Sequence, residues 1–369
     1  MYPDRIKGIK ISSPIPVVPG NCLPKNLTIM SSNNNVDLIK VGKSIYMCFR
    51  TAPTHFASSK TLLHIMRSDD DGKTWQKELS INMGRDLREP RFLYFKDRLF
   101  VYFYTGGTHP LKFEPSYIHF CERINNMQWT EPQPIFEPGY VVWRIRSYGD
   151  TAYMSVYYGL DIYGKGNRGE IRLLKSSNGL DWEPISNEPQ ISIVGAEEAE
   201  FMFDENGGII AIVRLEVTGG ALICRATADN LAHWECKRTS YKVDSSLMFK
   251  HDKRYFVVGR RNIAGRSTRE YWNFVPTKFR NAWNMVFYSL TRKRTCLYEI
   301  NPDTLELYPL IDLPSKGDTA FAGIVQISKD KYYLVNYSSP LEGFDLPWIA
   351  GQIFGSRLYG FIIDLSEVN

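Results

Sequence analysis

The chain repeats one short pattern of polar and apolar residues. In each occurrence a polar turn is followed by a mostly apolar run, and another apolar segment precedes the turn. Runs rich in Val, Ile, Tyr and Phe and bounded by Gly, Asp, Asn and Lys are typical of β-strands joined by hairpins. The six occurrences are 42–50, 96–104, 149–157, 206–214, 252–260 and 329–337.

The spacing of these occurrences predicts a repeat fold. The first five begin 46 to 57 residues apart, and the sixth begins 77 residues after the fifth. In four units a third strand follows and ends at a tryptophan, which is Trp75, Trp129, Trp182 or Trp234. Units of about four strands that recur at such a period are typical of propellers. We therefore predict an all-β fold, a six-bladed β-propeller formed by a single domain over residues 1–369.

Two segments depart from the repeat. The sixth unit has no clear fourth strand, and we expect an N-terminal strand at about 5–13 to fill that place and close the ring. The fifth unit carries an insertion at about 262–284 that is rich in Arg and aromatic residues. We expect a loop there, which either covers one face of the propeller or is a plain surface excursion.

Composition excludes some classes of function. The net charge is +5, which is compatible with an acidic ligand, but the longest basic run is only Arg292–Arg294. That pattern argues against nucleic-acid binding. The N-terminus has no apolar signal region and no stretch reaches membrane-spanning length, so we expect a cytoplasmic protein without a membrane partner.

The cysteines and glycines predict neither a metal nor a cofactor. The six cysteines lack the spacing of metal ligands, and no Gly-rich phosphate loop or Ser-His-Asp spacing is present. A reduced protein is the default expectation for a cytoplasmic chain. The alternative is a disulfide between Cys224 and Cys236, which can flank one hairpin.

The candidate site residues lie where inner strands begin and second strands end. In a propeller both of these strand ends lie at the same end of the central axis, which we call the mouth. The inner-strand starts give Asn34, Asn35, Asp86, Arg88, Glu89, Arg91, Arg144, Arg146, Glu197, Glu198, Glu200, Asp244 and Asp318. The second-strand ends give Arg50, Tyr104, Tyr158, Arg214, Arg260, Arg261 and Tyr337. One interpretation is a salt-bridge lattice that holds the blades together. The other is an anion site in which arginines bind a carboxylate and nearby carboxylates act on a glycosidic bond.

Two motifs resemble the sialidase (neuraminidase) superfamily. Ser68–Trp75 reads Ser-x-Asp-x-Gly-x-Thr-Trp and is similar to the Asp-box turn of sialidase-like propellers. The segment 198–203 followed by 206–214 resembles the sialidase strand pair in which a Glu precedes one strand and an Arg ends the next. The resemblance covers nearly the whole chain. It implies that Glu198 polarises a nucleophile and that Arg214 and Arg294 belong to a carboxylate-binding arginine triad, with Arg292 a weaker candidate than Arg294.

The chain also departs from that family in three places. Asn33–Val36 stands where sialidases carry their first arginine, and the loop 51–56 has no acid/base Asp. Phe321 stands where sialidases place a nucleophilic tyrosine, and its ring has no hydroxyl. Tyr337 or Tyr271 would have to replace that tyrosine. Other residues could supply the missing charge and proton transfer: these are Arg88, Arg91, Arg144, His55 and Asp318.

We therefore predict a glycoside hydrolase that cleaves a terminal acidic sugar, sialic acid or a related one. Glu198 would act with a second mouth carboxylate, which is Asp86, Glu89 or Asp318. The arginine cluster, including Arg50 and Arg260, and Tyr337 would bind the substrate. His55 is either an acid at the site or a solvated loop residue, and Asp318 is either an acid/base or a turn residue. A non-catalytic glycan-binding propeller and a protein-interaction scaffold remain as alternatives.

Overall fold

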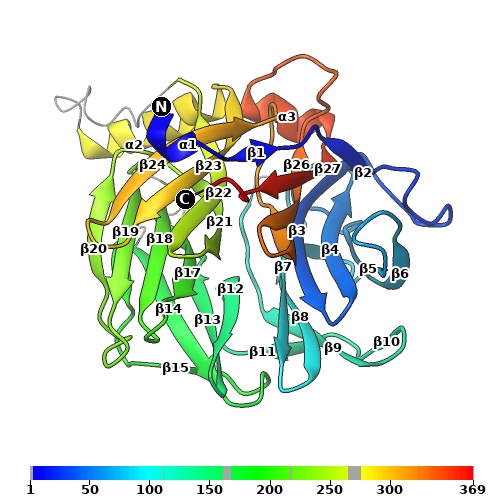
Figure 1. Cartoon of the computed structure of the whole chain (residues 1–369), viewed down its shortest axis with the longest axis horizontal. Helices are drawn as coiled ribbons and strands as arrows, with labels where there is room; N and C mark the ends of the chain where they lie inside the picture. Colours follow the sequence, from blue (N-terminus) through cyan, green and yellow to red (C-terminus); the bar gives the residue numbers. More distant parts are fainter. Residues whose placement is uncertain (1–2, 111, 161–167, 217, 265–275, 369) are drawn as a thin grey trace.

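The strands form six antiparallel sheets arranged around one axis, a six-bladed β-propeller (Figure 1). The computed structural model describes all residues except 1–2, 111, 161–167, 217, 265–275 and 369. The all-β fold and the six blades predicted from the repeats are confirmed. In each blade the strand order follows the sequence from the inner strand outward, except where the last blade takes strands from the N-terminus.

The first three blades follow one another along the chain. Blade 1 contains β3 (Ser32–Val41), β4 (Ser44–Ala52), β5 (Leu62–Ser68) and β6 (Gln76–Ile81). Blade 2 contains β7 (Asp86–Phe95), β8 (Arg98–Gly106), β9 (Ile118–Asn125), β10 (Gln128–Trp129) and β11 (Gln133–Ile135). Blade 3 contains β12 (Tyr140–Tyr148), β13 (Thr151–Tyr158), β14 (Arg168–Ser176), β15 (Glu183–Pro184) and β16 (Ile191–Val194).

The other three blades complete the ring. Blade 4 contains β17 (Ala196–Phe203), β18 (Ile209–Leu215), β19 (Ala221–Ala226) and β20 (Glu235–Thr239). Blade 5 contains β21 (Asp244–His251), β22 (Arg254–Asn262), β23 (Lys293–Asn301) and β24 (Glu306–Leu313). Blade 6 contains β25 (Gly323–Ser328), β26 (Lys331–Ser338), β27 (Arg357–Asp364), β1 (Lys10–Ile11) and β2 (Ile15–Val18).

Both ends of the chain meet in blade 6. β1 and β2 pair antiparallel with β27, so the N-terminal segment supplies the outer strands of the sheet that the C-terminal strand belongs to (Figure 1). A short helix, α1 (Pro3–Ile6), precedes them. This pairing joins the two ends of the chain by backbone hydrogen bonds.

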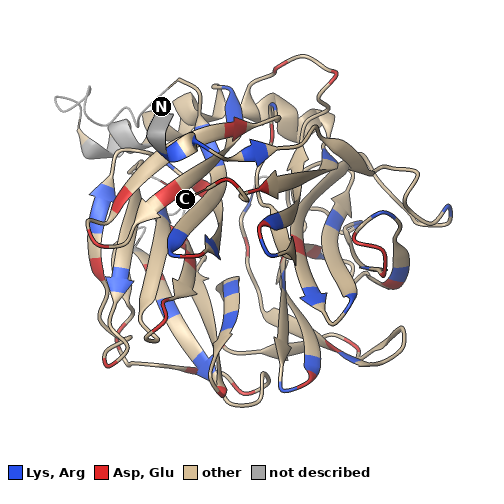
Figure 2. Ribbon diagram, viewed as in Figure 1, with Lys and Arg blue, Asp and Glu red and all other residues tan. Residues whose placement is uncertain are grey.

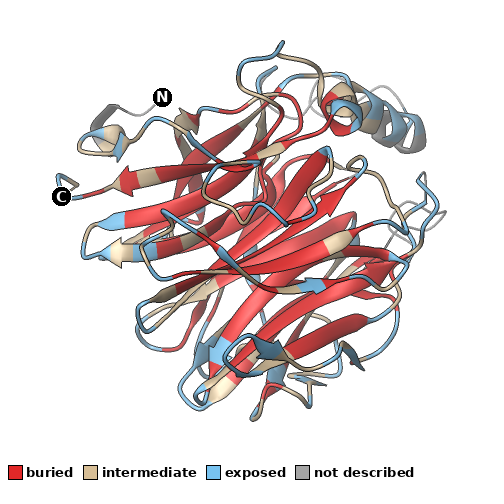
Figure 3. Cartoon of the chain, turned by 90° about the vertical axis from the view of Figure 1, so that its right-hand side faces the viewer, coloured by how far each residue is buried: buried red, intermediate tan, exposed pale blue. Residues whose placement is uncertain are grey.

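Helices occur in two connections near the mouth. The insertion in blade 5, which we expected to be a loop, contains α2 (Thr277–Ser289), and α3 (Trp348–Phe354) lies between β26 and β27. The two helices contact each other. Tyr288 is a buried residue of α2, whereas the outer side of that helix is exposed (Figure 3).

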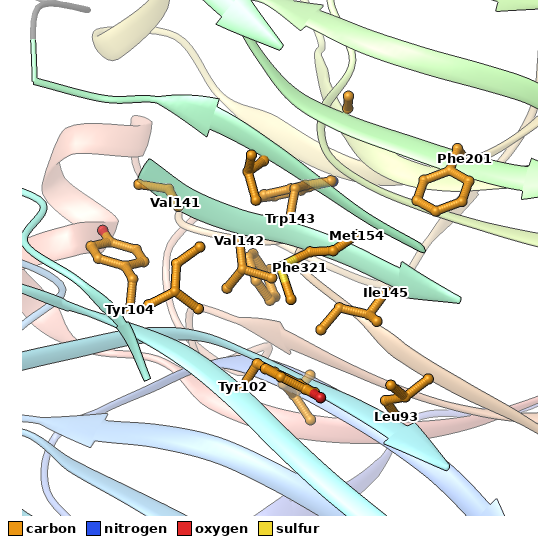
Figure 4. Close-up of a cluster of buried hydrophobic side chains, with 14 of the residues drawn as sticks. Leu93, Tyr102, Tyr104, Val141, Val142, Trp143, Ile145, Met154, Phe201 and Phe321 are labelled. Atoms are coloured by element: carbon orange, nitrogen blue, oxygen red, sulfur yellow. The ribbon is translucent and has the colours of Figure 1, made fainter. Parts of the chain in front are cut away.

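The hydrophobic core lies between the blades and around the axis (Figure 3). Trp143 and Phe321 pack edge to face near the axis, with ring centroids 5.2 Å apart (Figure 4). The guanidinium of Arg91 lies 4.2 Å from the centroid of the Phe321 ring. These two aromatic rings and one buried cation therefore pack together near the axis.

Most inner strands carry a bulge near their start. In blades 1, 2, 4 and 5, two residues of the inner strand face one residue of the second strand. A residue of each bulge has a positive φ, and Phe321 just before β25 has one too. Bulges of this kind normally use Gly, so other residues there store strain of about 1–3 kcal/mol each. We call these five the mouth residues: Asn35 (φ 48°), Glu89 (φ 55°), Glu198 (φ 51°), Ser245 (φ 53°) and Phe321 (φ 67°).

The turn at 68–75 has the mechanical role expected from its sequence. The Asp70 carboxylate accepts hydrogen bonds from the Thr74 N–H at 2.8 Å and the Thr74 hydroxyl at 2.7 Å. These two bonds, the hydroxyl's first, lower the pKa of Asp70 to about 2. Gly72 has a φ of 84° and Trp75 is buried. Asp70 therefore closes a turn between β5 and β6.

The cysteines correct one expectation. Cys224 and Cys236 are cross-strand partners in β19 and β20, and their sulfur atoms form a disulfide. The default expectation of a fully reduced chain is therefore wrong for this pair. The remaining four cysteines are free thiols. In the described part of the chain, no helix is long and apolar enough to cross a membrane, and no cluster of His, Cys, Asp and Glu has the geometry of a metal site.

Candidate functional site

A pocket of about 430 Å³ opens at the mouth, where the inner strands begin. All five mouth residues line it, and they come from five different blades. Tyr104, Tyr157 and Tyr337 add phenol rings to its wall, and α3 contributes Trp348 and Gln352. The strained backbone positions therefore converge on one space, as is common at functional sites.

Arg214 is surrounded by carboxylates. Its Nη1 lies 2.5 Å from Glu198 Oε1, and its Nε lies 3.0 Å from Asp244 Oδ1 and 3.2 Å from Glu197 Oε1. Glu216 accepts further hydrogen bonds from Nε and Nη2. The guanidinium of Arg214 is therefore already bonded to carboxylates of the protein and is not free to bind a ligand in the pocket.

Glu198 is fixed at both of its oxygens. Oε1 pairs with Arg214, and Oε2 accepts a hydrogen bond from the backbone N–H of Ser245 at 2.7 Å. Ser245 is itself a mouth residue of the neighbouring blade. Two adjacent blades therefore orient the Glu198 carboxylate toward the pocket that it lines.

Carboxylates outnumber cations among the charged residues around Glu89, Glu198 and Arg214. We call the set the mouth cluster; it comprises Glu89, Glu197, Glu198, Glu216, Asp244, Arg214, Lys242 and Arg260. Lys242 pairs with Glu216, and Arg260 Nη2 lies 3.5 Å from Asp244. Five acids of this set therefore share three bases in a buried space, and Glu89 is also influenced by the charges of Arg91 and Arg88. Such an excess raises the pKa of the acids that are least well paired.

The pKa of Glu89 is raised in these surroundings. Burial, followed by the negative charge of Glu198, raises the pKa of Glu89 to about 8. Burial also raises the pKa of Glu197 well above its usual value. No residue in the described part of the chain hydrogen-bonds to Glu89 Oε2. At neutral pH Glu89 is therefore a protonated carboxyl group that lines the pocket and can donate a proton.

His55 and Asp318 form a hydrogen-bonded pair beside the pocket. His55 Nδ1 lies 2.6 Å from Asp318 Oδ2, and Oδ1 of the same Asp accepts bonds from Tyr337 at 3.1 Å and Trp348 at 2.9 Å. Asp318 is fully buried, whereas His55 lines the pocket. Burial lowers the pKa of His55 despite the Asp318 charge, so its ring is neutral at pH 7. Because Nδ1 is engaged, Nε2 is the nitrogen left for a ligand.

Arg88 is the arginine with most freedom at the mouth. Asp86 bonds to both Arg88 and Arg50, and Arg88 Nη2 donates to the carbonyl of His55 at 2.5 Å. Burial would raise the pKa of Asp86, but the charges of Arg50 and Arg88 hold it below its usual value. Asp86 is thus a structural anion. Among the described residues, none accepts a hydrogen bond from Arg88 Nη1, which leaves that group for a ligand.

The structure brings together many of the predicted site residues and separates others. The pocket is lined by His55, Asp86, Arg88, Glu89, Glu198, Arg214, Arg260 and Tyr337. Arg50 and Asp318 lie immediately behind that lining, bonded to Asp86 and His55. Arg91 and Arg144 lie deeper along the axis with Asp37. Arg294 and Arg292 pair with Asp345 instead of lining the pocket, and Tyr271 lies outside the described residues.

Some lining residues were not expected from the sequence. Ser245, Tyr157 and Trp348 are among them. A signal for the mouth residues does exist, because each lies seven or eight residues before the polar turn of its repeat. Nothing comparable marks Trp348, which reaches the pocket from a helix outside the repeat.

Charges of both signs are interspersed over the face seen in Figure 2, so the excess of basic residues does not form one broad patch there. The ionic chemistry of the described chain is concentrated instead at its buried centre. There the exposed fractions of Arg50, Arg91, Arg144, Arg214 and Arg260 are all 6% or less.

Comparison with solved structures shows which fold this is. A protein of unknown function from Dyadobacter fermentans superposes with a TM-score of 0.67 at 16% identity, over 97% of this chain and 100% of that one. Trypanosoma rangeli sialidase in complex with sialic acid gives 0.60 at 12% identity, over 97% of this chain and 59% of the sialidase. The Hadza microbial sialidase Hz136 gives 0.56 at 12% identity, over 89% of this chain and 65% of that one.

These matches show a sialidase-like propeller fold. The chain spans about three fifths of the length of the sialidases it resembles. No family model matches the sequence, and no curated protein matches it either.

Proposed function

We propose that this chain is a glycoside hydrolase that cleaves a terminal acidic sugar, sialic acid or a related one, at the mouth pocket. The observation that carries the proposal is that two glutamates at equivalent positions of two blades line one pocket in different surroundings. Glu89 is a protonated acid with a pKa of about 8, and Glu198 is held as a carboxylate by Arg214. Glycoside hydrolysis uses such a pair, one acid and one carboxylate.

Each group has a distinct proposed role. Glu89 protonates the oxygen of the leaving group as the glycosidic bond breaks. Glu198 keeps its charge and stabilises the positive charge that develops on the sugar ring. His55, neutral and oriented by Asp318, takes a proton from the attacking water through Nε2. Because Phe321 offers no hydroxyl where sialidases have a tyrosine, water is the nucleophile in this scheme.

The substrate carboxylate is assigned to Arg88 and Arg260. Both line the pocket, and Arg88 Nη1 is free of partners in the described part of the chain. Arg260 donates to Tyr288 at 3.1 Å and to the Thr319 carbonyl at 3.2 Å, which fixes its position. Lys112 at the rim adds a third positive charge. Arg214 plays no part in substrate binding in this scheme, because four carboxylates already occupy it.

The test is a panel of aryl glycosides of sialic acid, related keto-deoxy sugars and uronic acids, with neutral sugars for comparison. We expect turnover of at least one acidic sugar by the wild type. Loss of general acid catalysis slows such reactions by about 10²–10⁴-fold. Glu89→Gln should therefore lose activity strongly with a poor leaving group and much less with nitrophenol, which departs without protonation.

Matched variants separate the roles. Glu198→Gln should lose activity with every leaving group, whereas Glu114→Gln, an exposed carboxylate at the same rim, should stay within about threefold of wild type. Turnover of neutral sugars alone would overturn the substrate class. A Glu89→Gln loss that does not depend on the leaving group would overturn the assignment of the acid.

A non-catalytic glycan-binding propeller is the second candidate, and it is favoured by the full engagement of Arg214 and by Phe321. It predicts that isothermal titration with the free acidic sugar shows binding while no aryl glycoside is turned over. It also predicts that Glu198→Gln binds as wild type does.

A further inference from the structure

A second buried group of charges lies along the axis, below the mouth pocket. We call it the channel cluster; it comprises Asp37, Arg91, Arg144, Arg146 and Glu200 from the inner strands of blades 1 to 4. Arg144 bonds to Asp37 at 3.2 Å and to Glu200 at 2.5 Å, and Arg146 bonds to Glu200 at 2.8 Å. The guanidinium of Arg91 lies over the rings of Trp143 and Phe321, and Phe321 also lines the mouth pocket.

The channel cluster has more cations than anions. Three guanidinium groups share the carboxylates of Asp37 and Glu200, which leaves one positive charge unbalanced. Glu89 also acts on Arg91 from the mouth side, but burial raises the pKa of Glu89 to about 8, so it is protonated at neutral pH. Burial, and then the charge of Arg144, lowers the pKa of Arg91 to about 10, which still leaves it charged.

Three buried N–H donors of this region have no acceptor in the described part of the chain. They are Arg91 Nη1, Arg144 Nη2 and Trp143 Nε1. Arg91 Nη1 lies 3.8 Å from Asp37 Oδ1, which is too far for a hydrogen bond, and Arg144 Nη1 bonds to that same oxygen. The exposed fractions of Arg91 and Arg144 are 1% and 6%. A buried charged donor without a partner is costly, so these groups require one.

Space for a partner exists on the side away from the mouth. A cavity of about 280 Å³ is lined by Asp37, Arg144 and Arg146 together with apolar side chains such as Leu247 and Val325. Lys250 also lines it, but its ammonium pairs with Glu205 at 3.2 Å. An ion can therefore reach Arg144 and Arg146 without passing through the mouth pocket, whereas Arg91 and Trp143 lie behind the lining of this cavity.

We propose that the channel cluster binds one small monovalent inorganic anion of the halide class between Arg91 and Arg144. A single negative charge balances the excess of one positive charge, and a halide accepts hydrogen bonds from several directions. Water could satisfy the same donors but would leave the charge unbalanced. The anion site is distinct from the proposed glycosidase site, because Trp143 and Phe321 pack between the mouth pocket and the channel cluster, but both proposals use the protonated state of Glu89.

The direct test uses bromide in place of chloride. Crystals of the whole chain are grown or soaked in sodium bromide, and diffraction is measured at the bromine absorption edge. We expect an anomalous peak within hydrogen-bond distance of Arg91 Nη1 and Arg144 Nη2. Density for water alone at that place would overturn the proposal.

Thermal unfolding shows whether the site fills in solution. We expect the Tm to rise by about 2 °C between 10 and 200 mM chloride at constant ionic strength set with gluconate. Arg91→Met removes the excess charge, so its Tm should no longer respond to chloride. If that variant does not fold, Arg144→Lys, which keeps the charge and removes Nη2, should weaken the response.

Arg294→Met changes an arginine remote from the channel and serves as the control that keeps the chloride response. A bromide peak without any chloride response of the wild-type Tm would mean an adventitious ion only, and it would overturn the proposal. A response that survives in Arg91→Met and Arg144→Lys would overturn it as well.

Discussion

The mouth cluster and the channel cluster both combine arginines with carboxylates, but the charges in the two clusters have opposite imbalances. In the mouth cluster five acids share three bases, whereas in the channel cluster three arginines share two acids. Both are buried at the centre of the propeller, and Trp143 and Phe321 lie between them. The difference therefore lies in composition and not in depth.

The excess charge of each cluster is neutralised in a different way. A carboxylate can take up a proton, and the raised pKa of Glu89 shows that the mouth cluster does so near neutral pH. An arginine cannot lose its proton in the same range, so the channel cluster needs an anion instead. Excess acid thus produces a proton donor, and excess base produces an ion-binding site.

Removing Arg214 should have the largest effect on stability. Arg214→Met leaves Glu198, Glu197 and Asp244 without their common cation in a buried space. Loss of one partner from a buried ionic group costs about 3–5 kcal/mol. Urea unfolding at pH 7 measures the change, with Arg294→Met as a control expected to lose about 1 kcal/mol or less. Equal losses in the two variants would show that the mouth cluster is not organised around Arg214.

Removing the Phe321 ring, which lies between the two clusters, should have the second-largest effect on stability. Phe321→Ala removes a buried ring that contacts Trp143 and Arg91, and the cavity should cost about 3 kcal/mol in free energy of unfolding. Water would then reach Arg91, so the chloride response of the Tm should weaken. Phe321→Leu fills more of the space and should lose less. A chloride response unchanged in Phe321→Ala would show that the ring does not isolate the channel.

Glu89→Gln should stabilise the protein, although Glu89 is the general acid of the proposed reaction. The folded pKa of Glu89, about 8, lies above its unfolded value, so wild-type stability falls as the pH rises from about 4.5 to 8. Gln matches the protonated group and does not titrate, so the variant should gain about 1–3 kcal/mol at pH 7. Urea unfolding between pH 5 and 8 should show a flatter profile than that of wild type or Glu114→Gln. Parallel profiles would mean that Glu89 is ionised in the folded protein.

Substitution of Asp70 in the turn at 68–75 should have the smallest effect on stability. It tests whether this turn at the edge of a blade influences the properties of either cluster. Asp70→Ala removes two hydrogen bonds to Thr74 and should cost about 1 kcal/mol. Chloride response and the pH profile of stability should match those of wild type. Asp70→Asn, which keeps one acceptor oxygen, should lose less than Asp70→Ala. A change in either profile would link this turn to the buried centre.

The sequence predicted the fold well because strand patterns repeat locally. The apolar runs and the polar turns between them are sufficient to place blades and to bring Glu198, Arg214 and His55 to one end of the propeller. The disulfide of Cys224 and Cys236 was the less favoured alternative, because spacing alone does not show that two cysteines are cross-strand neighbours.

The electrostatic state of the site could not be predicted in the same way. Glu216 and Lys242 lie outside the strand starts that the register marks, yet they complete the ionic shell of Arg214. The protonation of Glu89 depends on burial and on Glu198, which is far away in sequence. The catalytic and binding roles of these residues stay predictions until the variants are measured.

The five mouth residues also bear on how such a protein can change its specificity. Each extends from a separate blade into one shared space, and the strand pairing within each blade does not involve the side chain at that position, although Glu198 and Phe321 also contact other blades. A substitution there alters the chemistry of the pocket and leaves the pairing of neighbouring strands intact. Gly, Asn and Asp tolerate the left-handed backbone of these positions, whereas Val and Ile do not. A combinatorial library restricted to these five positions and to tolerant residues is therefore the shortest route to altered ligand selectivity on this scaffold.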